Sequence, residues 1–259
     1  MTSPIEIAGV AKEYDGAGGA VQALARVDLA IAAGEFVSIV GPSGCGKSTL
    51  LYILGGFVPA SDGTILVGGR PVTGPGIDRG IVFQEYALFP WLTVLGNISY
   101  GLEMKGLGAA ERDAIARRYV TLIGLEGFEH RFPRELSGGM RQRVALARTL
   151  VYEPAVLLLD EPFGALDAQT REIMQDELLR LWRTTRNTVL MVTHDVAEAV
   201  YLSQRVCVMS GRPGRIVETF DTALDHAPGR EAVMLSERFT ALRNLVWLKV
   251  REQVAGKAA

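Results

Sequence analysis

The residues from Gly41 to Thr49 read Gly-Pro-Ser-Gly-Cys-Gly-Lys-Ser-Thr, and their types suit the binding of a phosphate chain. The glycines let the backbone curl so that successive N–H groups point at an anion. Lys47 offers a cation to the outer phosphates, and Ser48 offers a hydroxyl ligand to Mg²⁺. Apolar runs at 36–40 and 50–54 supply the strand and helix that such a loop requires, which disfavours a plain Gly/Ser turn. We therefore predict a nucleoside triphosphate site made of Gly41, Pro42, Ser43, Gly44, Cys45, Gly46, Lys47, Ser48 and Thr49.

Two further apolar runs, at 155–159 and 188–192, end in side chains that could act on a bound nucleotide. The carboxyl ends of parallel strands meet at one edge of a sheet, so we expect these side chains beside the phosphate loop. Asp160 would hold the Mg²⁺ shell, and Glu161 would polarise the attacking water as general base. His194 would reach the γ-phosphate. The alternative is that the acidic pair only caps the next element and that the histidine is structural.

Two more side chains have both a structural and a functional interpretation. Gln84 ends an expected strand at 80–84, where it is either a surface residue or a ligand to a metal or a water molecule. Tyr14 lies in a polar break in the chain, where it is either an ordinary loop aromatic or a stacking platform for a base.

A second anion-receiving helix N-terminus is expected at Leu136–Gly139. Ser137 is a good N-cap residue, and Gly138 and Gly139 leave backbone N–H groups exposed. One phosphate chain seldom needs two such cradles from the same chain. We therefore expect a nucleotide site shared between two copies of the chain.

The remaining pattern predicts alternating strands and helices. Strands are expected near 5–10, 27–31 and 64–67, and a terminal hairpin at 205–218. From Glu85 to about Arg134 the chain reads as a mostly helical inserted lobe with helices at 94–102 and 109–123, whose aromatic entrance is either a docking surface or packing against the core. Further helices are expected at 171–186, with Ile173, Leu178, Leu179, Leu181 and Trp182 on apolar positions, and at 235–254, with Leu235, Phe239, Leu242, Val246 and Val250.

Composition restricts the class of protein. The 259 residues carry a formal net charge of −2, which gives no bulk reason to expect nucleic-acid binding. The two cysteines, Cys45 and Cys207, suggest neither a disulfide framework nor a metal site. We expect no signal peptide and no membrane-spanning run, so that any membrane role comes through a partner.

In this order, the motifs resemble the ATP-binding subunit of ABC transporters over roughly residues 5–220. The resemblance implies an α/β fold: a P-loop NTPase (RecA-like) core, an antiparallel β-subdomain and an inserted α-helical subdomain. It implies an ABC ATPase domain at 1–225, with its core at 1–87 and 155–225 and its helical insert at 88–154, and a C-terminal helical extension at 226–259.

The resemblance also implies roles for individual residues. Tyr14 is similar to the adenine-stacking aromatic, Gly41–Thr49 to the Walker A loop, and Gln84 to the glutamine that contacts Mg²⁺ and senses the transmembrane partner. Asp160 and Glu161 resemble the Walker B aspartate and catalytic glutamate, Asp167 the dimer-contact aspartate, and His194 the switch histidine. Ser137, Gly138 and Gly139 resemble the signature, in which Met140 stands where many members have Gln.

A further resemblance, carried by 76–80, 89–94, 137–143 and 210–215, is to importers of nitrate, taurine and alkanesulfonates. It implies an ATPase using ATP and Mg²⁺, a head-to-tail homodimer, a transmembrane permease and, indirectly, an extracytoplasmic solute-binding protein. The expected location is the cytoplasmic face of the membrane, peripheral through the permease. The alternatives are a soluble ABC-type ATPase acting on nucleic acid or ribosomes, an exporter half, or another P-loop NTPase.

Overall fold

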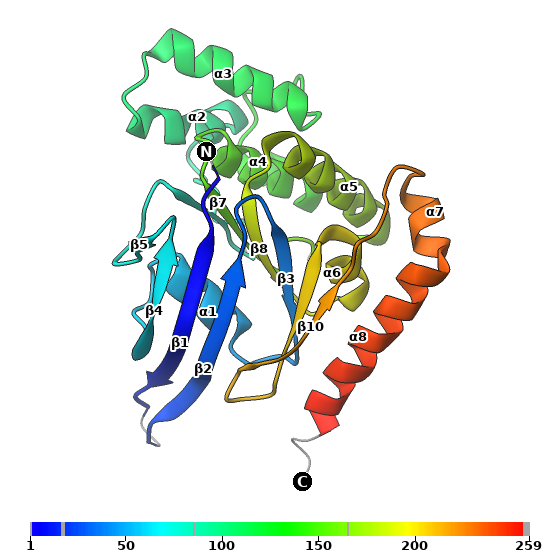
Figure 1. Ribbon diagram of the computed structural model, residues 1–259. Coiled ribbons are helices and arrows are strands. Elements are labelled where there is room, and N and C mark those ends of the chain that lie inside the picture. The colour runs from blue at the N-terminus through cyan, green and yellow to red at the C-terminus, as the bar shows by residue number, and fades with distance from the viewer. Residues whose placement is uncertain (1, 17–18, 85, 165, 256–259) are drawn as a thin grey trace.

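The computed structural model describes residues 2–16, 19–84, 86–164 and 166–255, and it arranges them in layers around a six-stranded sheet (Figure 1). The strands are β1 (Ile5–Tyr14), β2 (Val21–Ile31), β3 (Phe36–Val40), β4 (Asp62–Val67), β5 (Arg70–Pro71), β6 (Arg79–Val82), β7 (Val156–Asp160), β8 (Thr188–Thr193), β9 (Arg205–Met209) and β10 (Ile216–Asp221). The helices are α1 (Lys47–Leu54), α2 (Val94–Met104), α3 (Ala109–Leu122), η1 (Pro133–Glu135), α4 (Gly138–Leu150), α5 (Ala168–Thr185), α6 (Val196–Leu202), α7 (Arg230–Leu235) and α8 (Glu237–Ala255).

The six-stranded sheet has the order β10-β9-β3-β8-β7-β6, in which β9, β3, β8, β7 and β6 run parallel and β10 is antiparallel. Every residue of β3, β7 and β8 is buried, as expected for parallel strands covered on both faces. Successive side chains alternate between two cores. Phe36 and Val40 pack with α4, α5 and α6, whereas Val37 and Ile39 pack with α1 and the second sheet.

The second sheet is antiparallel, with the order β2-β1-β4-β5. Its inward residues, among them Ile5, Val10 and Val27, are buried against α1 and the parallel sheet. Tyr14 is the last residue of β1, whereas the sequence had suggested a break in the chain at this position. The mixed α/β architecture with an antiparallel subdomain agrees with the predicted fold class.

The lobe formed by α2, α3 and α4 has a core of its own, drawn in green at one end of the molecule (Figure 1). Val94, Ile98, Val120 and Val144 are among its buried members. Helix α2 begins where Thr93 Oγ1 accepts a hydrogen bond from Gly96 N–H at 3.1 Å. The predicted helices at 94–102 and 109–123 are therefore present.

Three features of the C-terminal third differ from the sequence-based prediction. The expected helix at 235–254 is present as α8, which begins two residues later, at Glu237, and the extended Ser236 (ψ 145°) separates it from α7, which was not predicted. Phe239 and Val246 are buried against the core, but Leu235 is 77% exposed. In α5, which begins at Ala168 rather than Arg171, Ile173 faces solvent. Helix α6 was not predicted from the sequence.

Among the described residues, no helix combines the length and apolar character needed to cross a lipid bilayer.

Candidate functional site

The phosphate loop joins the carboxyl end of β3 to α1 (Figure 1). Gly46 is the N-cap residue of α1 and has φ +107°, a conformation that glycine adopts without strain. A Cβ at this position would lie 2.7 Å from Leu24 Cδ2, so the close packing of β2 also requires glycine. Buried Lys47 donates from Nζ to the carbonyl oxygens of Gly41 (2.9 Å) and Pro42 (3.1 Å). The cation therefore lies within the loop itself.

Ser48 and Asp160 meet beside this loop. Ser48 Oγ donates to Asp160 Oδ1 at 2.9 Å, and Tyr52 Oη donates to Asp160 Oδ2 at 2.7 Å. Asp160 is 1% exposed, at the end of β7. A hydroxyl and a carboxylate in contact are oxygen ligands of the kind that Mg²⁺ takes together with nucleotide phosphates and water. The donor set therefore fits Mg²⁺. Within the described ranges no cluster of three or more acidic, histidine or cysteine side chains forms a separate metal site.

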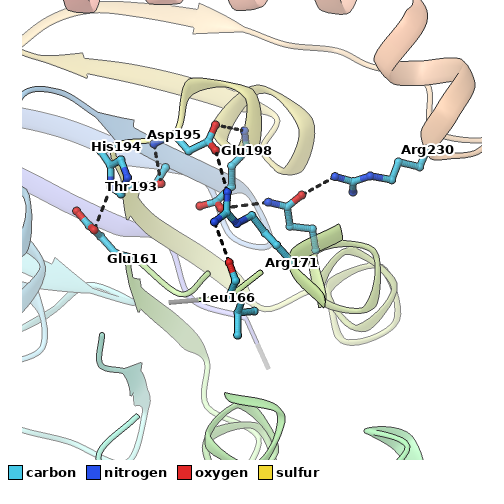
Figure 2. Close-up of polar contacts among 9 residues, drawn as sticks. Glu161, Leu166, Arg171, Thr193, His194, Asp195, Glu198 and Arg230 are labelled. Carbon is cyan, nitrogen blue, oxygen red and sulfur yellow. Dashed lines mark hydrogen bonds and ion pairs between the residues drawn. The ribbon is translucent and has the colours of Figure 1, made fainter. Parts of the chain in front are cut away.

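Glu161 and His194 meet at the same edge of the sheet, after β7 and β8. His194 Nδ1 lies 3.0 Å from Glu161 Oε2, a contact drawn as a dashed line in Figure 2. Glu161 has φ +45°, and its N–H donates to Val192 O at 2.9 Å. A non-glycine residue in this conformation is strained, and such strain concentrates at functional sites. A carboxylate in hydrogen-bond contact with an imidazole can take a proton from a water molecule.

A cavity of about 240 Å³ connects several of these residues. Its lining includes Tyr14, Lys47 and Glu161, together with most of the phosphate loop. The Tyr14 ring is 41% exposed, and Lys12 Nζ lies 4.9 Å from its centroid. An aromatic face, a basic loop and a carboxylate thus surround one space. A larger cavity of about 970 Å³, lined by Trp182 and His226 among others, includes none of the predicted site residues.

Arg212 lines the small cavity, and the sequence-based reasoning did not select it. Its Nη2 would lie 3.9 Å from a Cβ added to Gly44. It belongs to the β9–β10 connection, and β9 is the neighbour of β3 in the sheet. The signal available in the sequence was its place after an apolar strand, the same signal that selected Asp160 and His194.

Gln84 stands apart from this group. Strand β6 ends at Val82, two residues earlier than predicted, and Gln84 lies exposed in a turn. Within the described residues its side chain makes no hydrogen bond to Ser48 or Asp160. The next described residues, Tyr86 and Ala87, both have positive φ, and their carbonyl oxygens accept hydrogen bonds from Arg148 of α4 at 3.1 and 2.6 Å. Arg148 thus ties α4 to the chain that follows Gln84.

The signature residues lie at the start of α4. Ser137 is the N-cap residue, and its Oγ accepts from Met140 N–H at 3.3 Å. Gly139 is tightly packed, because a Cβ there would lie 2.4 Å from Thr170 Cγ2. Neither Ser137 nor the two glycines are among the described residues that line the cavity at the phosphate loop.

Asp167 is the N-cap residue of α5, and its Oδ1 accepts from Thr170 N–H at 3.0 Å. This backbone hydrogen bond lowers the pKa of the Asp167 carboxyl. Both helix starts, at Ser137 and at Asp167, therefore have a side-chain cap.

Comparison with known proteins assigns the family. The ABC transporter family matches residues 24–164. An ATP-binding protein of Brucella abortus is 53% identical over 235 residues, 91% of this chain and 90% of that protein. The nitrate import ATP-binding protein NrtD of Synechocystis is 46% identical over 251 residues, 97% of this chain and 93% of its own. The taurine import ATP-binding protein TauB of Burkholderia thailandensis is 50% identical over 228 residues, 86% and 88% of the two chains.

Solved structures agree with the relatives. The dimeric bacterial ABC transporter cassette MJ0796 superposes with a TM-score of 0.77 at 34% identity, covering 84% of this chain and 98% of its own. The same cassette in a post-hydrolysis dimer with ADP and Pi superposes with a TM-score of 0.76 at 33% identity and the same coverage. The chain belongs to the ABC transporter family and is an ABC-type ATPase.

Proposed function

We propose that this protein energises the import of a small anionic or zwitterionic solute, of the nitrate, taurine or alkanesulfonate type, through a separate membrane permease. The support for import is the similarity to NrtD and TauB, whose names specify nitrate and taurine import, over most of this chain. An extracytoplasmic solute-binding protein is the indirect partner. The protein lies at the cytoplasmic face of the membrane and is held there by the permease.

The Ser48–Asp160 contact is the observation that carries the proposed chemistry at this site. ATP lies along the phosphate loop, with its base against Tyr14. Lys47 turns from the carbonyl oxygens of its own loop toward the outer phosphates. Ser48, Asp160 and Gln84 would hold Mg²⁺, which would supply neutralisation of the phosphate charge. For Gln84, this role requires the turn that follows β6 to move closer.

Glu161 accepts the proton of the attacking water, and His194 holds Glu161 and contacts the γ-phosphate. The 3.0 Å contact between His194 Nδ1 and Glu161 Oε2 supports this pairing. Phosphoryl transfer needs little covalent chemistry from the protein, so positioning and charge neutralisation supply most of the rate enhancement.

Ser137, Gly138 and Gly139 act on the ATP of a second copy. Their N-terminal position on α4 suits an anion, whereas the described lining of the cavity within one chain does not include them. The cassette MJ0796 is dimeric in its solved structures. We infer a head-to-tail homodimer with ATP between the phosphate loop of one copy and the signature of the other.

The corresponding domain assignment is an ATPase domain at 1–225, with its core at 1–87 and 155–225 and the helical insert at 88–154. The extension at 226–259 follows, of which 256–259 lie outside the described residues. The insert is the permease-facing part. Its exposed aromatic residue Trp91, which is 71% exposed, supports a docking role.

The test is a pull-down with the tagged Glu161→Gln variant, extracted in mild detergent with and without ATP. We expect this variant to bind ATP and to hydrolyse it about 10²–10⁴-fold more slowly than the original protein. Co-purification of a multi-span permease supports the import function. Ribosomes, nucleic acid or a soluble complex in its place would leave the ATPase activity standing and contradict the transport role.

A further inference from the structure

A chain of polar contacts runs from the C-terminal extension to the loop that carries His194. Arg230 of α7 donates from Nη2 to Gln175 Oε1 at 2.7 Å, and Gln175 Nε2 donates to Glu198 Oε2 at 3.1 Å. Figure 2 shows this chain of contacts beginning at Arg230, and the contact between Glu161 and His194 beyond its other end as a separate pair. Because Gln175 and Glu198 belong to α5 and α6, three helices are joined through side chains.

The Glu198 side chain lies in the interior. The residue is 5% exposed and Gln175 is 3% exposed. The pKa of the Glu198 carboxyl is raised to about 7, chiefly by burial and in part by the charge of Asp195, and hydrogen bonding by Thr193 and Gln175 and the charge of Arg171 oppose this rise. Burying a carboxyl costs free energy, and packing alone does not account for a carboxyl at this position.

The backbone around His194 is fixed by the same group of residues. Glu198 N–H donates to Asp195 Oδ1 at 3.1 Å, which caps α6, and Asp195 N–H donates to Thr193 Oγ1 at 3.0 Å. His194 stands between these two residues. The capping donor is the backbone N–H of Glu198, so the Glu198 side chain bears on His194 by holding the first turn of α6, which carries the cap, against Gln175 of α5.

Two more contacts join this loop to its surroundings. Arg171 of α5 lies with Nη1 3.9 Å from Asp195 Oδ2, and its Nη2 donates to Leu166 O at 2.9 Å. On the exposed side, Arg243 and Trp247 of α8 line a cavity of about 630 Å³ together with His194. The extension thus borders the His194 loop directly through α8 and reaches it through the interior from α7.

We propose that Glu198 is a positioning residue for His194, and that Arg230, acting through Gln175, lets the C-terminal extension set the rate of ATP hydrolysis. The proposal rests on the role of His194 proposed above. The extension then has a function in this protein. Displacement of α7 breaks the contact between Arg230 and Gln175, Gln175 no longer holds the Glu198 carboxylate in place, and the orientation of His194 relative to Glu161 changes. ATP binding is untouched, because Tyr14 and Lys47 lie outside this group of contacts.

The first test is the steady-state ATPase rate of the full-length protein with point substitutions. Glu198→Ala and Arg230→Gln lower kcat by roughly tenfold and leave the KM for ATP unchanged. Glu198→Gln retains a hydrogen-bonding group of the same size and restores most of kcat. The matched controls are Glu172→Gln, on the exposed side of α5, and Lys249→Gln, an extension cation paired with Glu218 and Glu252, and both keep the original rate.

The second test separates positioning from general stability. In a His194→Ala background, Glu198→Ala has no further effect on kcat, because the side chain that it positions is gone. An equal loss in both backgrounds would overturn the proposal and make Glu198 a purely structural residue. Full activity of Glu198→Ala beside an inactive His194→Ala would overturn it while leaving the proposed function intact. Full activity of His194→Ala would contradict the proposed role of His194 itself.

Discussion

Ser48 Oγ donates a 2.9 Å hydrogen bond to Asp160 Oδ1 across 112 residues of sequence. The two side chains come together because β3 and β7 both run parallel to β8, which lies between them. Each strand delivers its carboxyl end to the same edge, so Ser48, at the start of the helix that follows β3, meets Asp160, the last residue of β7.

We expect Ser48→Ala to weaken Mg²⁺ binding at the ATPase site and to leave the binding of metal-free ATP unchanged. Loss of one oxygen ligand should raise the Mg²⁺ concentration needed for half-maximal activity by at least about tenfold, since replacing a residue that only supports a metal ligand already costs about 10–100-fold in metal affinity or activity. The measurement is the ATPase rate across a Mg²⁺ titration at saturating ATP. Ser99→Ala, in α2, is the control, and an unchanged titration for Ser48→Ala would remove Ser48 from the metal site.

Replacing the N-cap residue of α4 separates ATP binding from dimer formation. Ser137→Arg places a bulky cation at the helix start, so we expect ATP binding to persist while ATP-dependent dimers disappear. Size-exclusion chromatography with ATP, in the Glu161→Gln background, reads out the dimer. Glu126→Arg, in an exposed turn of the same lobe, should dimerise normally. Persistent dimers in Ser137→Arg would contradict the shared site.

Asn97 holds the aromatic stretch against α2. Its side chain is fully buried, accepts from Phe89 N–H at 2.9 Å and donates to the carbonyl oxygens of Phe89 (3.1 Å), Leu92 (3.0 Å) and Thr93 (3.0 Å). Asn97→Ala removes the partner of Phe89 N–H and Leu92 O, whereas Phe89 O and Thr93 O keep the backbone donors Leu92 N–H and Asn97 N–H, and it should lower the free energy of unfolding by about 1–3 kcal/mol. Urea denaturation measures this loss. Asn244→Ala, on the exposed surface of α8, is expected to change stability by less than about 0.5 kcal/mol.

The titration of Glu198 should appear in the pH dependence of stability. Its pKa is raised from 4.5 to about 7 by burial, so between these values the folded protein holds a proton that the unfolded chain has lost. The free energy of unfolding therefore falls as pH rises through this window, by about 3 kcal/mol at 1.36 kcal/mol per pKa unit. Glu198→Gln removes this contribution.

The comparison is between Glu198→Gln and the original protein, each unfolded by urea at pH 5 and at pH 8. The variant should gain stability relative to the original protein as pH rises. Glu172→Gln should track the original protein at both values. Parallel curves for all three proteins would show that Glu198 does not titrate with a raised pKa.

Helical and strand periodicity indicated most elements, and the misses have local causes. Helix α6 has seven residues, too few for a distinct apolar period, and it forms because Asp195 caps it and its residues are buried against the sheet. Helix α7 has six residues and ends at the extended Ser236, so it too is short for a periodic signal, and α8 follows with Phe239 buried in the core. Ile173 fits the apolar pattern of α5, yet it lies on the face that the core does not cover.

The sequence by itself determined the phosphate loop, the signature and the polar residues that end β7 and β8, because short motifs encode local backbone geometry and a fixed order of side chains. Only the tertiary structure decided which of these residues meet. It joined Asp160 to Ser48 and Glu161 to His194, added Arg212 to the cavity and left Gln84 in an exposed turn. It also brought Arg230 of the extension to Gln175 and Glu198. Contacts between distant segments depend on strand order and helix packing, which the burial of the whole chain fixes and no local pattern contains.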